Sequence, residues 1–325
     1  MKQLTQNLKT GRMEVSEVPI PVVSARSVLV RNHYSLISVG TEVSKVSTAR
    51  KGYLAKAIER PEQAKQVLGT LKKEGISSAF KKVMNKLDVL APLGYSASGE
   101  VIKVGYGISK FKVGDRVACA GAEIANHAEI ISVPENLVVK VPNEVAFSEA
   151  SFTTVASIAM HGVRQSGLRL SENCVVIGLG LIGQLTVQIL KASGINVIGI
   201  DIDKDSLELA KKSGADLVFE RFNGQEEQSI MNATGGYGTD AVIITAGTNS
   251  LDPIELAGKL CRRRGKVIIV GDVPTGFSRD NYYKKELELR MSTSYGPGRY
   301  DPKYEEKGLD YPIAYVRWTE NRNMQ

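Results

Sequence analysis

Three closely spaced glycines follow an apolar run in the middle of the chain. The segment Cys174-Val-Val-Ile-Gly178-Leu-Gly180-Leu-Ile-Gly183 leads into a helical pattern and then into a second apolar run that ends at Asp201. Gly178 permits a tight turn, Gly180 lets a pyrophosphate approach the backbone, and Gly183 lets the helix pack closely on a sheet. The phosphates would bind the free amides at the start of that helix. The pattern therefore predicts a dinucleotide site.

The acid that ends the second apolar run indicates which dinucleotide is bound. A carboxylate at this place accepts hydrogen bonds from both ribose hydroxyls of NAD and repels the extra phosphate of NADP. Lys204 is a nearby cation that would weaken this preference. We therefore expect NAD, with NADP less favoured. The expected cofactor-binding residues are Gly178, Gly180, Leu181, Ile182, Gly183, Asp201, Ile202, Ala246, Val270 and Gly271.

The length and composition are those of an ordinary globular protein. The 325 residues, of which 42% are hydrophobic and 24% charged, leave room for two domains. No apolar run approaches the roughly 20 residues that span a bilayer, and the start lacks the apolar core of a signal peptide. We therefore expect a cytoplasmic protein with no transmembrane segment. Cys119, Cys174 and Cys261 lie far apart, which favours free thiols over disulfides.

The net charge of +7 comes from one segment. Residues 45–88 contain eleven Lys and Arg against four Asp and Glu, which accounts for the whole excess. The basic balance therefore does not indicate a nucleic-acid-binding protein. Two or three helices are predicted between about 47 and 88. A solvated charged face is the simpler interpretation of them, and docking to an anionic glycan, a nucleotide-sugar or a lipid surface is the alternative.

The chain is expected to fold as two blocks. Up to about residue 147, short runs alternate apolar and polar residues, which predicts a β-rich domain. From 148 to 294, strands alternate with helices, which predicts an α/β domain with parallel strands and helical crossovers. Six such strands would make a complete doubly wound Rossmann domain. The expected strands are 174–178, 196–201, 217–219, 240–245, 266–270 and 287–293, and the expected helices are 149–166, 181–193, 204–213, 225–233 and 253–262.

Three further motifs precede the glycine fingerprint. They are Ser38-Val-Gly-Thr-Glu42, Pro92-Leu-Gly-Tyr-Ser-Ala-Ser-Gly-Glu100 and Val113-Gly-Asp-Arg-Val117. Together with the fingerprint, they resemble the medium-chain dehydrogenase/reductase superfamily over nearly the whole chain. The resemblance implies a homo-oligomeric enzyme that transfers a hydride between nicotinamide and an alcohol or carbonyl carbon. It implies a GroES-like catalytic domain at 1–147, an NAD-binding domain at 148–294, and a return toward the catalytic domain at 295–325.

The sequence departs from the zinc-dependent members of this superfamily at the metal site. Val39 stands where those members have a Cys ligand, and Tyr95 stands where they have a His. The third ligand place falls near 152–155, where the sequence offers no metal-binding side chain. A zinc site needs three or four N, S or O ligands, and valine supplies none. We therefore expect an enzyme without zinc.

Without zinc, another group must polarise the substrate oxygen and move its proton. Tyr95 is the first candidate because a phenol can donate to and accept from an alkoxide, although it could instead fill the vacated metal cavity. Thr41 stands where the family has a Ser or Thr that relays the proton, and a turn role is the alternative. Glu42 follows it and could orient a neighbour by hydrogen bonding. His127 could face the cleft but is not favoured as the base.

A polar segment follows the last expected strand, at the edge where open α/β sheets bind ligands. Tyr295, Arg299 and Tyr300 offer ring faces and a planar cation suited to a sugar, a carboxylate or a phosphate. A solvated glycine-proline turn is the alternative. With the helical insertion, this segment resembles bacterial oxidoreductases in which a medium-chain unit is fused to a Gfo/Idh/MocA-type sugar dehydrogenase, a group associated with surface polysaccharide synthesis. In that case the chain would lack a C-terminal fusion domain.

These features predict a zinc-independent, NAD-dependent oxidoreductase. Its small-molecule substrate would be a secondary alcohol or ketone of a sugar or nucleotide-sugar, including anionic sugars. One alternative is a quinone or enone reductase of the same superfamily, although such enzymes usually have a basic residue where Asp201 stands. Another is a dinucleotide-binding module without catalytic activity.

Overall fold

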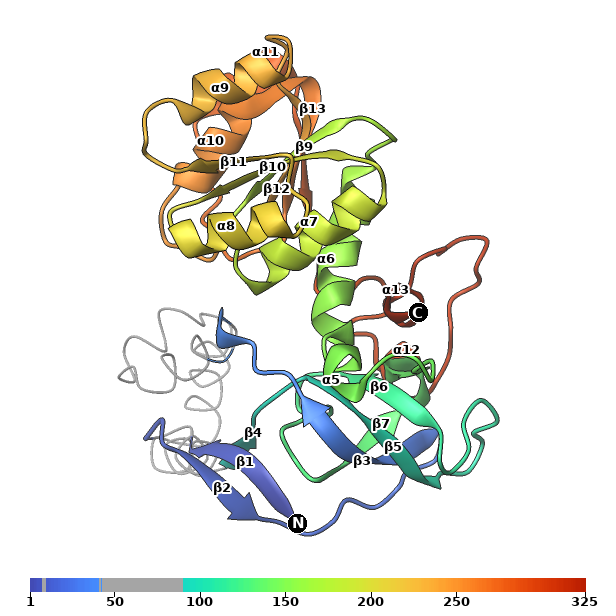
Figure 1. The fold of residues 1–325 in the computed structure, drawn as a ribbon. Helices are drawn as coiled ribbons and strands as arrows, with labels where there is room; N and C mark the ends of the chain where they lie inside the picture. The colour runs from blue at the N-terminus through green and yellow to red at the C-terminus, as the bar shows by residue number, and fades with distance from the viewer. Residues whose placement is uncertain (8–9, 41, 43–89) are drawn as a thin grey trace, which may run out of the picture. The chain divides into compact units, whose positions relative to one another are not determined.

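The chain forms two compact units in a computed structural model that describes residues 1–7, 10–40, 42 and 90–325 (Figure 1). Unit 1 comprises residues 1–152 and unit 2 comprises residues 153–325. The helices predicted for about 47–88 lie outside the described residues, as does Thr41.

Unit 1 contains two antiparallel sheets. The larger has the strand order β7-β3-β5-β6-β8, and the smaller has the order β2-β1-β4. Val30 of β3 pairs with Val101 of β5, and both side chains are fully buried. The described elements are β1 (Lys2–Asn7), β2 (Met13–Glu17), β3 (Ser27–Ser35), β4 (Leu90–Pro92), β5 (Ser96–Val104), β6 (Arg116–Ala120), β7 (Ile130–Pro134), the short 3-10 helix η1 (Glu135–Leu137), β8 (Val138–Lys140) and α5 (Phe147–Ala150).

Unit 2 is built on a six-stranded parallel sheet with the order β11-β10-β9-β12-β13-β14. The strands are β9 (Asn173–Ile177), β10 (Asn196–Asp201), β11 (Leu217–Glu220), β12 (Thr239–Ile244), β13 (Cys261–Ile269) and β14 (Glu288–Met291). The chain moves outward from β9 in one direction, through β10 and β11, and then from β12 in the other. This is the order of a doubly wound dinucleotide fold.

Helices cover both faces of this sheet (Figure 1). Val175 and Ile177 of β9 pack in one cluster with residues of α9, α10 and α11. Cys174 and Val176, which alternate with them, pack in a second cluster with residues of α6, α7 and α8. The helices are α6 (Thr153–Ser166), α7 (Leu181–Ala192), α8 (Lys204–Lys212), α9 (Glu226–Ala233), α10 (Asp252–Leu260) and α11 (Arg279–Lys285).

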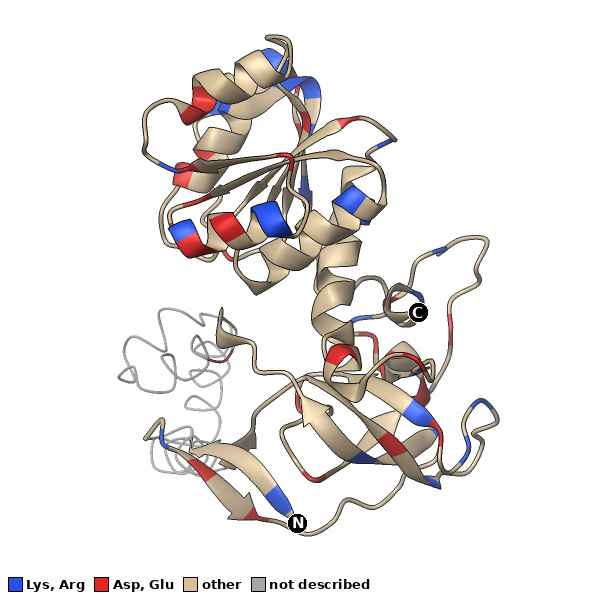
Figure 2. Cartoon of the chain, in the orientation of Figure 1, with Lys and Arg blue, Asp and Glu red and all other residues tan. Residues whose placement is uncertain are grey.

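Charged residues are distributed as this two-sided burial requires. The central strand β9 carries no Asp, Glu, Lys or Arg, whereas α8 carries five of these residues within nine positions. Figure 2 shows the same contrast between the sheet and its outer helices. The predicted fold class, a GroES-like β-rich domain with a six-stranded Rossmann domain, is therefore confirmed.

The expected single helix at 149–166 is two helices, α5 and α6. The carbonyl oxygen of Ser151, at the break between them, accepts a hydrogen bond from the Ser96 hydroxyl at 2.6 Å. That contact occupies an oxygen that would otherwise be available to a continuous helix. The prediction was wrong because the interrupting group lies far away in the sequence.

Strand β13 and helix α11 also differ from expectation. The strand begins at Cys261, five positions earlier than predicted, because Cys261 pairs with Thr239 ahead of an irregularity in the register. Helix α11 was not predicted because its sequence lacks an apolar repeat and buries only Tyr282. The Tyr282 hydroxyl donates to the carbonyl oxygen of Ile254 at 2.7 Å, which fixes this short helix on α10.

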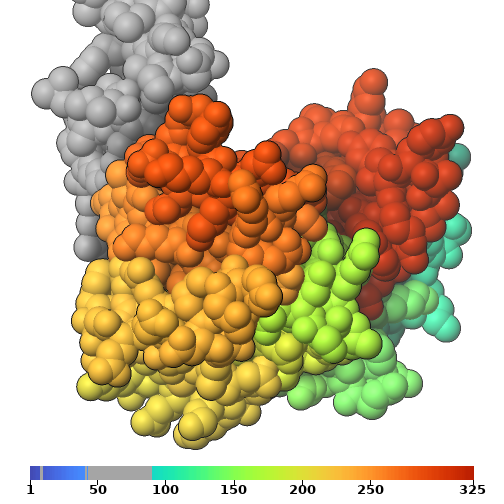
Figure 3. Space-filling model, turned by 90° about the horizontal axis from the view of Figure 1, so that it is seen from above, coloured from blue at the N-terminus to red at the C-terminus, as the bar shows by residue number. Residues whose placement is uncertain are grey.

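The segment from residue 295 onward packs on α6 through the helix α13 (Glu320–Met324), and a short helix, α12 (Pro302–Glu305), precedes it. In Figure 3 this segment, in red, forms a lobe of its own beside the gold and orange helices of unit 2. Ser157 of α6 donates to the carbonyl oxygen of Asn323 at 3.2 Å. Asn323 in turn donates to the carbonyl oxygen of Tyr295 at 2.9 Å.

Glu320 is fully buried in this lobe, and neither carboxyl oxygen has a hydrogen-bond partner. Burial raises the pKa of Glu320 to about 9; nearby Glu305 raises it as well, and Arg299 lowers it. A carboxyl group without a partner is far less costly to bury when it is protonated. Glu320 is thus expected to carry a proton in the folded protein near neutral pH.

The raised pKa makes the stability of the fold depend on pH. The unfolded chain loses the Glu320 proton near the ordinary value of 4.5, whereas the folded chain keeps it until about 9. The contribution of Glu320 to stability is therefore full below the lower value and falls as pH rises between the two. We expect Glu320→Gln to be more stable than wild type by a few kcal/mol at about pH 8, and nearly equal to it at about pH 4, in thermal melts.

The exposed neighbour Glu306 provides the control for this measurement. Glu306→Gln should follow the wild-type melting curve at both pH values. Equal melting temperatures for Glu320→Gln and wild type at the higher pH would contradict a buried proton on Glu320.

Candidate active site

The glycine turn after β9 brings three backbone segments into close contact. Gly178 has a φ of +92°, and a Cβ placed there would lie 2.6 Å from the amide nitrogen of Ala246. A Cβ on Gly183 would lie 2.0 Å from the carbonyl oxygen of Gly178. Neither position can accept a side chain without displacing backbone. The roles predicted for these two glycines therefore match their surroundings.

Gly180 has different surroundings, because nothing lies within 4 Å of a Cβ placed on it. It precedes α7 with an extended backbone, and no side chain caps the helix. The first intrahelical bond runs from the amide of Gln184 to the carbonyl oxygen of Gly180, at 2.9 Å. The amides of Leu181 and Ile182 therefore have no partner within the helix, and the helix dipole favours an anion beside them. This arrangement fits a pyrophosphate.

Asp201 is fixed to the same turn. Its Oδ2 accepts from the Leu179 amide at 2.5 Å, and its Oδ1 accepts from the amides of Ile202 at 2.7 Å and Asp203 at 2.9 Å. The carboxylate is half-buried at the end of β10, while Ile202 is exposed. Because each carboxylate oxygen has two acceptor sites, Oδ1 is fully used and Oδ2 keeps one site, which can accept a hydrogen bond from a ribose hydroxyl.

The remaining predicted cofactor residues lie at the ends of β12 and β13. A Cβ on Gly271 would lie 2.1 Å from the carbonyl oxygen of Ala246. The amides of Val270 and Gly271 both donate to the carbonyl oxygen of Ile244, at 2.9 Å. Ala246 therefore contacts both Gly178 and Gly271, which brings the predicted set together along the carboxyl edge of the sheet.

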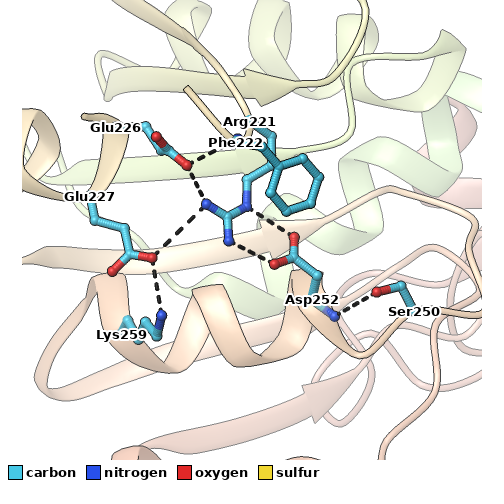
Figure 4. A network of polar contacts seen from close by, with 7 residues as sticks. All are labelled: Arg221, Phe222, Glu226, Glu227, Ser250, Asp252 and Lys259. Atoms are coloured by element: carbon cyan, nitrogen blue, oxygen red, sulfur yellow. Dashed lines mark hydrogen bonds and ion pairs between the residues drawn. The ribbon is translucent and has the colours of Figure 1, made fainter. Parts of the chain in front are cut away.

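Arg221 is a cation whose backbone lies beside this edge, since its amide donates to the carbonyl oxygen of Asp201 at 2.8 Å. Its side chain is mostly buried and held by carboxylates (Figure 4). Asp252 binds the guanidinium with two contacts, at 3.0 and 2.7 Å, and Glu226 binds it as well. The hydrogen bond with Asp252 raises the pKa of Arg221. Lys204 is paired with Glu220 at 3.6 Å.

A polar cluster in unit 1 gathers around His127. Its Nδ1 lies 2.8 Å from the Ser35 hydroxyl, and its Nε2 lies 3.1 Å from Oε1 of Glu42. The side chains of His127 and Glu42 are 9% and 12% exposed. Glu42, which was predicted as a catalytic residue, is thus placed against a histidine that the sequence did not favour.

Tyr95 and Val39 are the two residues that the sequence predicts to stand in the places of metal ligands. The Tyr95 side chain is buried in a bend directly before β5, and Val39 is 67% exposed. Among residues 1–7, 10–40, 42 and 90–325, no three His, Cys, Asp or Glu side chains converge on a common point. The three cysteines are buried and unbridged.

The three residues predicted to contact substrate lie in the lobe that begins at residue 295. Tyr295 is buried, and its hydroxyl has no hydrogen-bond partner. The Arg299 guanidinium forms an ion pair with Glu305 and stacks over the ring of Tyr300 at 4.1 Å. Tyr300 is 69% exposed. The segment thus holds its cation in a fixed orientation, with one exposed ring over it.

Each of the two units contains a segment that matches a known domain family. The alcohol dehydrogenase GroES-like domain family matches residues 65–143, and the zinc-binding dehydrogenase family matches residues 182–307. The chain is 31% identical over 209 residues to an alcohol dehydrogenase of Geobacillus stearothermophilus, which is 56% of this chain and 61% of that protein. It is 31% identical over 156 residues to D-guloside 3-dehydrogenase of Escherichia coli, which is 48% of this chain and 44% of that protein.

These matches span less than two thirds of either relative's length. Among solved structures, galactitol-1-phosphate dehydrogenase from Escherichia coli superimposes with a TM-score of 0.72 at 20% identity, covering 92% of this chain and 85% of that one. The chain belongs to the medium-chain alcohol dehydrogenase-like superfamily. None of the described helices is long and apolar enough to cross a membrane.

The glycine turn yields a paired prediction. Gly183→Ala should destabilise the fold by about 1–3 kcal/mol or more, because its Cβ would overlap the carbonyl oxygen of Gly178. Gly180→Ala should leave stability within about 0.5 kcal/mol of wild type, since its Cβ enters open space. It should nevertheless weaken NADH binding about tenfold or more, by filling the place of the pyrophosphate.

Urea unfolding and NADH fluorescence titration measure the two effects separately. If Gly180→Ala bound NADH as tightly as wild type does, the turn would not hold the cofactor.

Proposed function

We propose that this protein is an NAD-dependent, zinc-independent oxidoreductase that interconverts a secondary alcohol and a ketone on a sugar or nucleotide-sugar. The observation that carries the proposal is the turn at Gly178, Gly180 and Gly183 with Asp201 bonded to it. When bound, NAD supplies a hydride acceptor at its nicotinamide ring. The chain's own task is to orient that ring and the substrate, and to manage the substrate's proton.

The charges around Asp201 support NAD over NADP. An NADP phosphate would meet the Asp201 carboxylate and would need a free cation beside it. Arg221 is bound by Asp252 and Glu226, and Lys204 by Glu220. Among the described residues near Asp201, the Arg221 guanidinium is thus held by two carboxylates, whereas the exposed Lys204 ammonium is only loosely paired and weakens the preference.

The side chains at the predicted metal-ligand places support the absence of zinc. The place of the cysteine ligand is taken by the aliphatic side chain of Val39, and the place of the histidine ligand by the phenol of Tyr95. These residues do not fit a tetrahedral zinc site. We therefore assign the polarising role to protein groups. Tyr95 is a candidate donor to the substrate oxygen, and Thr41 and Glu42 are candidates for moving its proton.

The substrate class is supported by two observations. D-guloside 3-dehydrogenase and galactitol-1-phosphate dehydrogenase are named for a sugar derivative and a polyol phosphate. In this chain, Arg299 is held between Glu305 and the exposed ring of Tyr300. A stacked cation beside an aromatic ring suits a polar, ring-shaped or anionic ligand. We propose Tyr295, Arg299 and Tyr300 as part of the substrate-binding region.

A screen for NADH formation tests this proposal. Purified protein would be incubated with NAD and a panel of polyols, glycosides, polyol phosphates and nucleotide-sugars, with and without a strong metal chelator. We expect turnover on at least one carbohydrate and an equal rate in the chelator, because no step uses a metal.

Each other result contradicts one part of the proposal. Activity lost in the chelator and restored by zinc would contradict the metal-free site. NADH binding without turnover on any compound would favour a dinucleotide-binding module. Turnover on quinones alone would favour a quinone reductase.

A further inference from the structure

His127 bridges two side chains that come from different parts of unit 1. Ser35 ends strand β3, Glu42 follows it by seven residues, and His127 lies shortly before β7. The Ser35 hydroxyl contacts Nδ1 at 2.8 Å, and Oε1 of Glu42 contacts Nε2 at 3.1 Å. Both ring nitrogens are therefore occupied in one continuous chain of polar groups.

The hydrogen-bond partners define the direction of this chain. Oε1 of Glu42 also accepts from the Ser38 amide at 3.2 Å, so this oxygen acts as an acceptor. An ionised carboxylate can only accept, and therefore Nε2 of His127 must carry the proton that it shares with Glu42. Nδ1 then has a lone pair and accepts from the Ser35 hydroxyl. In this tautomer, His127 is ready to take up a proton on the side of Ser35.

The position of the ring is fixed by the backbone. The His127 amide donates to the carbonyl oxygen of Leu93 at 2.8 Å, and its carbonyl oxygen accepts from the Leu4 amide at 2.8 Å. Gly94 lies against the imidazole, since a Cβ on Gly94 would be 3.0 Å from Nδ1. The ring thus rests against the residue before Tyr95, while Ser35 and Glu42 lie on either side of Val39 in the sequence. The cluster therefore lies against the residue that precedes Tyr95, the residue predicted to stand in the place of a histidine ligand.

We propose that Ser35, His127 and Glu42 form a proton relay for the alcohol-ketone reaction; this inference rests on the proposed function. Ser35 is the half-buried outer member and would contact the substrate hydroxyl. His127 and Glu42 are positioning residues that act through it. The arrangement parallels hydrolase triads in its use of a hydroxyl, an imidazole and a carboxylate, but here it moves a proton without forming a covalent bond to Ser35.

In oxidation, bound NAD would accept the hydride, with its electron pair, that leaves the substrate C–H bond. The substrate O–H bond breaks, its proton passes to Oγ of Ser35, and the Ser35 proton passes to Nδ1 of His127. The carbonyl double bond forms, and the Glu42 carboxylate stabilises the imidazolium. Reduction reverses each transfer.

The tautomer of His127 can be measured without any substrate. The chain has three histidines, so nitrogen NMR of the labelled protein resolves each ring. The proposal predicts a proton on Nε2 of His127 in wild type above the pH at which the ring becomes neutral. In Glu42→Gln the preference for this tautomer should weaken. A proton on Nδ1 in wild type would mean that His127 donates to Ser35, and would overturn the relay.

Kinetics with the carbohydrate found in the screen test the role in catalysis. His127→Gln and Ser35→Ala should lower kcat about 100-fold, the usual range for loss of acid-base catalysis, with unchanged affinity for NADH. Ser35→Thr keeps the hydroxyl and should recover most of the rate. His127→Gln should also remove an ionisation from the pH profile of kcat. His33→Gln is the matched control, because His33 is exposed on the same strand as Ser35 and stacks on Phe147.

The outcomes separate the two proposals. If wild type turns over but His127→Gln keeps the wild-type kcat and pH profile, the relay is wrong and the proposed function stands. If wild type turns over no compound, the proposed function fails, and the relay in the alcohol-ketone reaction fails with it. A third result is that His127→Gln lowers kcat, weakens NADH binding and keeps the wild-type ionisations in the pH profile. In that case His127 has only a structural role.

Discussion

The close approach of four backbone segments at the carboxyl edge of the parallel sheet is the constraint on which unit 2 depends. The carbonyl oxygen of Gly178 lies where a Cβ of Gly183 would be, and the backbone of Ala246 contacts both Gly178 and Gly271. These contacts fix the start of α7 on the sheet. They leave open space around Gly180, and the helical amides that follow it have no partner within the helix, which is the geometry that an anionic cofactor requires.

The proposed preference for NAD over NADP rests on the charges beside this turn. Asp201 bonds to the amide of Leu179 within the turn, so the acid that would contact the ribose and the amides that would contact the phosphates form one rigid unit. One strand further out, Arg221 is neutralised by Asp252 and Glu226. A buried pair of this kind contributes little net stability when its desolvation is counted. Its clearer consequence is that the strand end next to Asp201 offers no free guanidinium to a phosphate.

The parts of the fold that were predictable from sequence are those with local causes. The alternation of Cys174 and Val176 with Val175 and Ile177 marks a strand buried on both faces. A Cβ on Gly183 would overlap the carbonyl oxygen of Gly178, which lies in the same short motif. The break between α5 and α6 was not predictable, because the Ser96 hydroxyl that binds Ser151 lies 55 positions away.

The cluster in unit 1 was missed for the same reason. His127 lies 92 residues from Ser35 and 85 residues from Glu42, so neither contact leaves a local signal. The predicted catalytic set included Glu42 but not its histidine partner. The roles of Tyr95 and Thr41, the absence of zinc and the fusion to a second enzyme domain stay predictions.

Calorimetric titration of NADH and NADPH into the purified protein tests the central claim most directly. Our account predicts one NADH per chain and an affinity for NADPH lower by about tenfold or more, which corresponds to about 1.4 kcal/mol of unfavourable interaction at Asp201. Equal or tighter binding of NADPH, or no binding of either cofactor, would contradict it.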